Sequence, residues 1–271
     1  MYDQSAIDRA EFIHGPRELL AQYLAQVSDQ MHELGLRLRI SADFERLIEL
    51  SRQQRENWPP LSPIFNPKYS DLGIETSFLI ECVDELGDTV MTSAGRLYDH
   101  GDRSLGEDLR SLRIFYRDPA PYLASGDVIT VTAPSAEHIF GRTGYSGAVW
   151  VRPDYRRHGL TKIIPRLTRS VLFARWNTPV FWATIAPNLD AVGVTRAYGS
   201  WHVEDGVTAH MPLWQGDCKV LFLSMGQATL IRDIAHSVDA YEVKVGASRW
   251  IDNVIASRSL PGKTQGMMSR S

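Results

Sequence analysis

The spacing of apolar residues predicts two helices in the N-terminal part of the chain, with a strand between them. Over residues 16–34, apolar side chains recur at intervals of three and four, which is typical of one buried helix face. Residues 36–40 alternate apolar and charged positions, which indicates a strand. Ser41 is expected to cap a second helix over 42–58, and the prolines that follow bring this helix to an end.

The middle of the chain changes to a pattern of strands. Residues 74–83 and 89–98 are predicted to pair as a hairpin through a tight turn. The segment 99–143 is interpreted as an insertion that holds a helix over 105–116 and a β-branched run over 128–132. Further elements are then expected in the order strand 147–152, helix 162–176, strand 180–185, helix 189–198, strands 202–211 and 219–225, and helix 227–238.

This order of elements predicts the class of fold. Strands first follow one another as a meander and later alternate with helices, which is the pattern of a mixed central sheet flanked by helices, in the α/β or α+β class. Three parts are expected along the chain. They are an N-terminal helical extension over 1–33, a main domain over 34–240 with its insertion at about 99–143, and a partly flexible C-terminal extension over 241–271.

Composition narrows the classes of function. The 271 residues carry a formal net charge of −3, which disfavours nucleic acid and anionic membranes as partners. The N-terminus lacks the features of a secretory signal, and no run approaches the roughly 20 apolar residues of a membrane span. We therefore expect a cytoplasmic protein with no membrane partner. Cys82 and Cys218 lie in apolar stretches, where buried thiols are expected rather than a disulfide.

The segment 151–161, with the sequence VRPDYRRHGLT, carries the clearest chemical signal. An apolar strand ends there, Pro153 prevents further pairing, and Gly159 permits a tight backbone path directly before a helix. Such a junction leaves backbone N–H groups unpaired at the positive end of the helix dipole, which favours a pyrophosphate. Arg156, Arg157 and Lys162 add positive charge. The simpler interpretation is an exposed basic turn that only caps the helix.

These residues resemble motif A of the GNAT (Gcn5-related) N-acetyltransferases, V-x-P-x-Y-R-x-x-G-x-G/A. Val151, Pro153, Tyr155, Arg156 and Gly159 stand at the matching positions. The chain departs from the motif at Thr161, where the family prefers Gly or Ala. The resemblance extends over about 36–225, with the same order of elements, so a GNAT-like sheet is expected, with the insertion placed before the cofactor-binding strand.

A second stretch resembles motif B of the same family, N-x-x-A-x-x-x-Y-x-x-x-G-F. Asn188, Ala191 and Gly199 fit with the spacing intact. Thr195 stands where the motif has its tyrosine. Tyr198 follows three residues later on the same helical face, so it is a candidate for a displaced phenol.

The resemblance implies a site and a reaction. It implies direct transfer of an acyl group from acetyl-CoA, or another acyl-CoA, to a primary amine of a small molecule or peptide, with Tyr198 and Thr195 as catalytic candidates. It assigns acyl-CoA binding to Val149, Val151, Arg156, Arg157, His158, Gly159, Leu160, Thr161 and Asn188. No spacing of His and Cys supports a metal.

Several points stay open at this level. The general base is not identified, since none of Glu75, Glu81, Glu137, His138, His202 and His210 has a distinguishing position. The departures at Thr161 and Thr195 leave open a GNAT-fold protein that binds acyl-CoA without turnover. A basic helix face, with Arg166, Arg169 and Arg175 expected in solvent, leaves open an interaction domain. A homodimer is neither indicated nor excluded.

Overall fold

The computed structural model describes residues 13–212 and 216–258, and its strands form one sheet in the order β1-β2-β3-β5-β6-β8-β7-β4. Neighbouring strands are antiparallel, except for the parallel pair β5 and β6 at the centre. The strands are β1 (Arg37–Ser41), β2 (Ser77–Val83), β3 (Thr89–Asp99), β4 (Val128–Val131), β5 (Arg142–Val151), β6 (Val180–Ile185), β7 (His202–Met211) and β8 (Gly216–Gly226).

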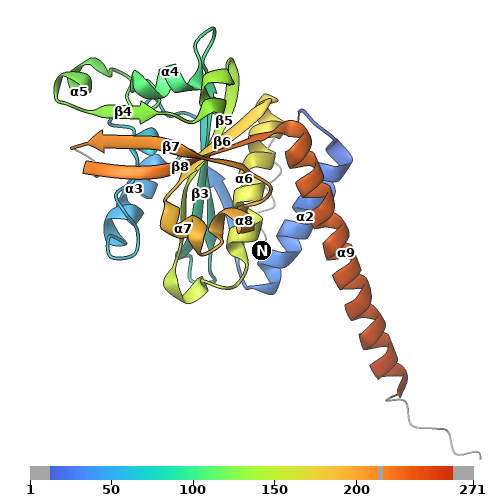
Figure 1. The fold of residues 1–271 in the computed structure, drawn as a ribbon. Helices are drawn as coiled ribbons and strands as arrows, with labels where there is room; N and C mark the ends of the chain where they lie inside the picture. The colour runs from blue at the N-terminus through green and yellow to red at the C-terminus, as the bar shows by residue number, and fades with distance from the viewer. Residues whose placement is uncertain (1–12, 213–215, 259–271) are drawn as a thin grey trace, which may run out of the picture.

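Helices cover both faces of this sheet (Figure 1). One face carries α2 (Arg17–Glu33), α6 (Leu160–Trp176) and α9 (Gln227–Arg258), and the other carries α3 (Phe44–Gln53), α4 (Leu105–Arg110) and α5 (Ala120–Ala124). Two short helices, α7 (Pro187–Ala191) and α8 (Val194–Tyr198), lie between β6 and β7. Single 3₁₀ turns are η1 (Pro63–Phe65), η2 (Pro134–His138) and η3 (Pro153–Tyr155). The expected mixed sheet flanked by helices is confirmed.

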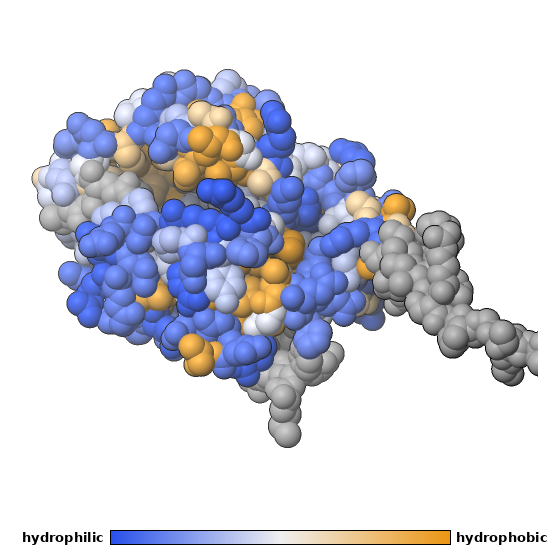
Figure 2. Space-filling model, turned by 90° about the horizontal axis from the view of Figure 1, so that it is seen from below, coloured by the Kyte–Doolittle hydropathy of each residue, from blue (hydrophilic) through white to orange (hydrophobic). Residues whose placement is uncertain are grey.

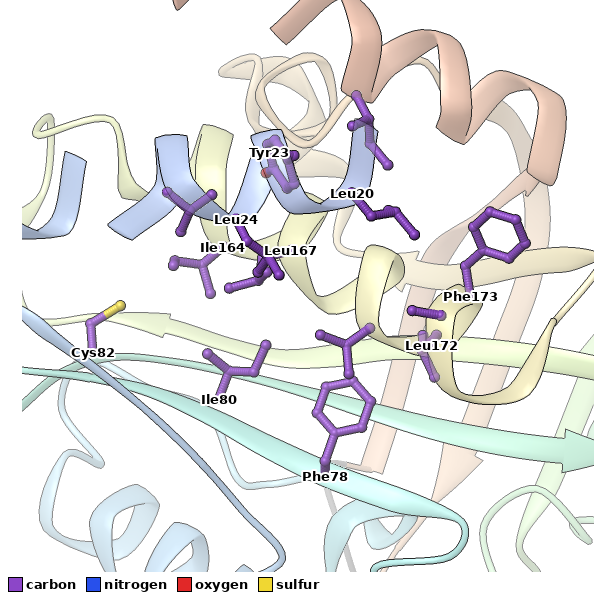
Figure 3. Packing of buried hydrophobic residues seen from close by; sticks show 14 of the residues in the cluster. Leu20, Tyr23, Leu24, Phe78, Ile80, Cys82, Ile164, Leu167, Leu172 and Phe173 are labelled. Carbon is purple, nitrogen blue, oxygen red and sulfur yellow. The ribbon is translucent and has the colours of Figure 1, made fainter. Parts of the chain in front are cut away.

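The strand alternation divides the core into two layers. Phe78 and Ile80 of β2 pack with α2, α6 and α9, whereas Leu79 between them packs with α3 on the other face. Figure 3 shows α6 lying between α2 and the sheet, with Ile164 and Leu167 of α6 beside Leu24 of α2. Because α6 is packed on both sides, its N-terminus has a fixed position relative to the end of β5.

Several predicted elements differ from the observed ones at their ends. The second helix ends at Gln53, and its cap is Asp43, whose carboxylate accepts a hydrogen bond from the Arg46 amide; Ser41 instead belongs to β1. The helix expected over 105–116 stops at Arg110, and Leu112 shortly after it has a left-handed φ of 61°. The helix expected over 189–198 is broken at Gly193, which has a φ of 85°.

The insertion is joined to the sheet, and the helix of the C-terminal part is longer than expected. Within the insertion, β4 pairs with β7 and so forms one edge of the sheet. Helix α9 runs through residue 240, so the domain boundary expected there falls inside a helix. Residues 1–12 and 259–271, which belong to the two expected extensions, lie outside the described residues. Both cysteines are free thiols, as expected, but only Cys82 is buried, whereas Cys218 is partly exposed. Among the described residues, none of the helices is long and apolar enough to span a bilayer.

Candidate active site

The parallel strands β5 and β6 separate soon after they meet. They pair only over Thr143–Tyr145 of β5 and Val180–Trp182 of β6, after which β6 continues alongside β8 alone. The C-terminal half of β5 therefore has β3 on one side and no paired strand on the other. A pocket of about 220 Å³ occupies the opening between the two strands and is named the splay pocket below.

A bulge in β5 shapes the wall of this pocket. Thr92 of β3 pairs with Trp150 and Ala94 pairs with Gly147, so β5 has one residue more than β3 over this stretch. Ala148 adopts a left-handed φ of 50°, a conformation that costs a non-glycine residue about 1–2 kcal/mol. Its carbonyl accepts a hydrogen bond from Thr92 Oγ1 over 2.8 Å. The bulge takes the backbone of Ala148 and Val149 out of the regular ladder where it lines the splay pocket.

The lining of the splay pocket is mainly apolar and aromatic. Trp58, Phe65 and Tyr145 come from one side, and Leu189, Tyr198 and Trp201 come from the other. The described lining contains no carboxylate and no imidazole. Figure 2, which views the molecule from below, shows a mainly hydrophilic surface with a hollow that has apolar side chains along one margin and hydrophilic side chains along the facing one.

The loop after β5 leads into α6 through two residues in the left-handed region. Arg157 has a φ of 71°, and Gly159, which precedes the first residue of α6, has a φ of 81°. The first amides of α6 have no partner within their own helix, so they and the positive end of the helix dipole face the loop. Arg152 is not free to add charge here, because it pairs with Asp84 at 3.1 Å and Asp154 at 2.8 Å.

A second pocket, of about 590 Å³, begins at this helix start and is named the basic pocket below. Helices α2, α6, α8 and α9 form its walls. Its basic side chains are His158, Lys162, Arg166, Arg196, His236 and Lys244, and no carboxylate occurs in the part of its lining that the structure describes. An anion is the ligand that such a lining favours.

The structure brings some of the predicted site residues together in these two pockets. Val149 and Tyr198 line the splay pocket, while His158 and Gly159 line the basic pocket. Arg156 and Arg157 are exposed in the loop, and Thr161 is half-buried in the first turn of α6. Leu160 is buried in the core.

Arg156, Arg157, Leu160 and Thr161 line neither pocket, and three further predicted residues also lie outside both. Val151 is buried and pairs with Met91 of β3. Asn188 is exposed on α7 and lines neither pocket. Thr195 is buried on α8, its hydroxyl has no hydrogen-bond partner among the described residues, and it also lines neither pocket.

Tyr198 is held at the splay pocket by a buried cation that the sequence did not identify. The Arg169 guanidinium donates a hydrogen bond to the Tyr198 carbonyl oxygen and lies 4.7 Å from the centre of the Trp201 ring. The prediction that Arg169 lies in solvent is wrong: its side chain is fully buried, and burial lowers its pKa to about 9. Apolar residues on nearly every face of α6 were the signal that little of this helix is solvated.

The phenol of Tyr198 stays protonated over the ordinary pH range. Burial raises the pKa of this group above its usual value of 10. The group can therefore donate a proton or a hydrogen bond, but it does not serve as a base near neutral pH.

Comparisons with known proteins give structural likeness only. No model of a known family matches the chain, and no curated protein matches it. Among solved structures, aminoglycoside acetyltransferase AAC(6')-Ib with coenzyme A and kanamycin is 16% identical, with 73% of this chain and 98% of that chain covered and a TM-score of 0.40. FeeM, an N-acyl amino acid synthase from uncultured soil microbes, is 9% identical over 72% and 92% of the two chains, with a TM-score of 0.41. The spermidine/spermine N-acetyltransferase SpeG from Vibrio cholerae is 9% identical over 73% and 97%, with a TM-score of 0.40.

The observed fold agrees with the expectation of a mixed sheet flanked by helices. The chain itself supplies the features: a mixed sheet with one central parallel pair, a splay between those strands, and a left-handed glycine that opens the following helix. At these identities and TM-scores, the likenesses establish no activity for this protein.

Proposed function

We propose that this protein is an acyl-CoA-dependent N-acyltransferase that moves an acyl group, most simply acetyl, to a primary amine by direct attack. The observation that carries this proposal is the arrangement of two unlike pockets about α8. Tyr198 of α8 lines the mainly apolar splay pocket, and Arg196 and Ala197 of the same helix line the basic pocket. An elongated ligand with one uncharged arm and one polyanionic end fits this pair.

The basic pocket supports binding of the phosphates. The Lys162 amide already donates to the Gly159 carbonyl over 2.8 Å, but the Leu160 and Thr161 amides before it have no carbonyl partner within the helix. These two amides and the left-handed Gly159 allow a close approach of an anion to the backbone. Lys162 and Arg166 lie on the first two turns of the same helix and line the pocket beside it. Thr161, which replaces the small residue of motif A, is half-buried at this helix start, so its hydroxyl is a candidate contact for a phosphate.

The splay pocket supports the transfer step. Backbone amides near the bulge at Ala148 and Val149 lie outside the regular ladder, so they are candidate donors to the thioester oxygen as negative charge develops on it. The amine nitrogen attacks the thioester carbon and the carbon–sulfur bond breaks. The amine gives its proton to water, because no described side chain of the lining is a base. The thiolate takes a proton from water, or from the Tyr198 phenol, which then regains a proton from water.

A second candidate function is acyl-CoA binding without turnover. It is favoured by one observation: Thr195 stands where motif B has its tyrosine, and its buried hydroxyl faces neither pocket. The two functions differ in product formation but share the ligand.

An assay of turnover distinguishes the two candidate functions. The protein is incubated with acetyl-CoA and a panel of primary amines, and free thiol and acetylated amine are both measured, together with the intact mass of the protein. Direct transfer predicts equal amounts of thiol and acetylated amine, and no acetyl adduct on the protein. An adduct that forms and decays at the turnover rate would contradict direct attack. Binding of acetyl-CoA with no product from any amine would favour the binding protein.

A further inference from the structure

A third pocket lies beside the splay pocket and belongs to neither of the regions described above. It measures about 380 Å³, which is within the range of roughly 300–1,000 Å³ that small-molecule sites occupy. Pro60 and Leu61 line both this pocket and the splay pocket, so the two lie on adjoining sides of the same segment. Its other walls come from α3 and from the insertion that carries Tyr116 and Tyr122.

One side of this third pocket is aromatic. The rings of Tyr116 and Tyr122 are stacked with their centres 3.7 Å apart, and Tyr69 meets both edge-on at 5.9 Å. Tyr116 donates a hydrogen bond over 2.6 Å to Asp127, which is buried and does not line the pocket. The hydrogen bond to Asp127 holds Tyr116 in place, and the three tyrosines form an aromatic wall of the pocket.

The charged residues on the other side are arginines. Arg52 and Arg55 line the pocket, and its described lining includes no carboxylate. Arg52 is already bound to Glu49 through two hydrogen bonds of 2.8 and 2.9 Å. Arg55 is exposed and has no ion pair within residues 13–212 and 216–258, so its guanidinium is available for a carboxylate.

We propose that this third pocket binds the amine acceptor, and that the acceptor carries a carboxylate beside an apolar or aromatic body, as a free aromatic amino acid does. The inference rests on the proposed acyl transfer, and it names the class of substrate. The carboxylate pairs with Arg55 and the body packs on the three tyrosines. The amine, which a free amino acid carries on the same carbon as its carboxylate, then lies on the side of Pro60 and Leu61, the two residues that also line the splay pocket. A polycationic acceptor is disfavoured, because both charged residues of the lining are positive.

Equilibrium binding tests the proposed acceptor site without requiring turnover. Calorimetry first measures binding of CoA, which lacks the acyl group and so cannot react. The CoA-saturated protein is then titrated with L-phenylalanine, with phenethylamine, which has the same ring and amine but no carboxylate, and with spermidine. We expect phenylalanine to bind a few-fold to about tenfold more tightly than phenethylamine, since the latter lacks the carboxylate that pairs with the exposed Arg55 guanidinium. Spermidine is expected to bind more weakly than phenylalanine.

Two variants locate the effect. Arg55→Gln is expected to remove the preference for phenylalanine and leave CoA binding unchanged, whereas Arg113→Gln, at an exposed arginine outside all three pockets, keeps both. Three results would each overturn the acceptor inference. They are equal affinity of the wild-type protein for phenylalanine and phenethylamine, a preference for phenylalanine that is retained in Arg55→Gln, and no binding of phenylalanine to the CoA complex. Failure of CoA itself to bind appears in the first titration and overturns the proposed function instead.

Discussion

Trp182 of β6 donates a hydrogen bond from its indole nitrogen to Thr143 Oγ1 of β5 over 3.1 Å. Thr143 is the first residue of β5 that pairs with β6, and Trp182 is the last residue of β6 that pairs with β5. The same hydroxyl lies 2.9 Å from His100 Nε2, and His100 Nδ1 lies 2.8 Å from Asp108. This buried chain of hydrogen bonds holds β5 and β6 together where they pair, next to the point at which the two strands diverge.

Replacing Thr143 by valine is expected to destabilise the fold. The change keeps the shape of the side chain but leaves the Trp182 N–H and His100 Nε2 without their partner, and a buried unpaired group costs about 1–3 kcal/mol. Urea unfolding measures the loss. Thr130→Val, at an exposed position on the edge strand β4, is the matched control and should change the free energy of unfolding by less than about 0.5 kcal/mol. Equal losses in the two variants would show that the chain of bonds is not stabilising.

Gly159→Asp is expected to abolish CoA binding. The side chain adds bulk and negative charge at the start of α6, where the proposed pyrophosphate approaches the backbone. Gly141→Asp is the control, since Gly141 also has a left-handed φ, of 63°, and space for a side chain. Both variants bear a similar backbone strain, so their melting temperatures should fall alike. Retention of CoA by Gly159→Asp in a filter or calorimetric assay would contradict binding of the pyrophosphate at the start of α6.

Arg196→Gln is expected to weaken CoA binding by a few-fold to about tenfold, and more at low salt than at high salt. The guanidinium is exposed in the basic pocket, so its attraction to a phosphate is screened by ions. Affinities measured over a range of ionic strengths report the effect. Arg113→Gln should show neither the loss nor the change in salt dependence, and an identical response of the two variants would mean that the pocket does not bind the phosphates.

Tyr198→Phe is expected to slow turnover and leave CoA affinity almost unchanged. Burial raises the pKa of this phenol, so it keeps its proton through pH 10, and wild-type activity should not fall below that pH through its ionisation. Tyr98→Phe is a partly buried control outside the splay pocket: it loses a hydrogen bond to the Ile114 carbonyl oxygen and should affect stability rather than turnover. Unchanged turnover in Tyr198→Phe would make Tyr198 a structural residue.

Protonation of the Asp108 carboxylate is expected to account for part of the loss of stability in acid. Burial alone would raise the pKa of this carboxyl, but hydrogen bonds from Arg103 and His100 outweigh it and hold the pKa below its usual value of about 3.9. A lowered pKa means that the stabilisation is fully present above the unfolded-state pKa and is lost as the pH falls through the folded-state pKa. Urea unfolding between about pH 6 and pH 3 should show a shallower pH dependence for Asp108→Asn. An unchanged slope would mean that Asp108 does not contribute.

The sequence predicted the parts of the fold that depend on local patterns. The helix at 16–34 and the strand–loop–helix around Gly159 follow from periodicity and from the signals that start or end an element, and the structure has α2 and α6 there. Local patterns could not reveal the bulge at Ala148, because an extra residue in β5 is defined only by its pairing with β3.

The pockets depend on contacts between distant segments. Arg55 and Tyr122 are far apart in the sequence and meet only because α3 and the insertion cover the same face of the sheet. The basic pocket likewise needs α9, whose length the apolar pattern underestimated. Arg169 was expected in solvent because a charged residue usually lies there. The apolar residues around α6 indicate a packed helix, but the contact of α8 with α6 that accompanies the burial of Arg169 is seen only in the structure.

A thermal-shift titration with CoA and acetyl-CoA tests the central claim most directly. At about 100 times the dissociation constant, a bound ligand adds ~2.7 kcal/mol to stability, which corresponds to a rise in melting temperature of roughly 5–10 °C for a chain of this size. We expect this rise for the wild-type protein and no rise for Gly159→Asp. If neither ligand shifts the wild-type melting temperature at millimolar concentration, acyl-CoA is not the ligand of these pockets and the proposed function is wrong.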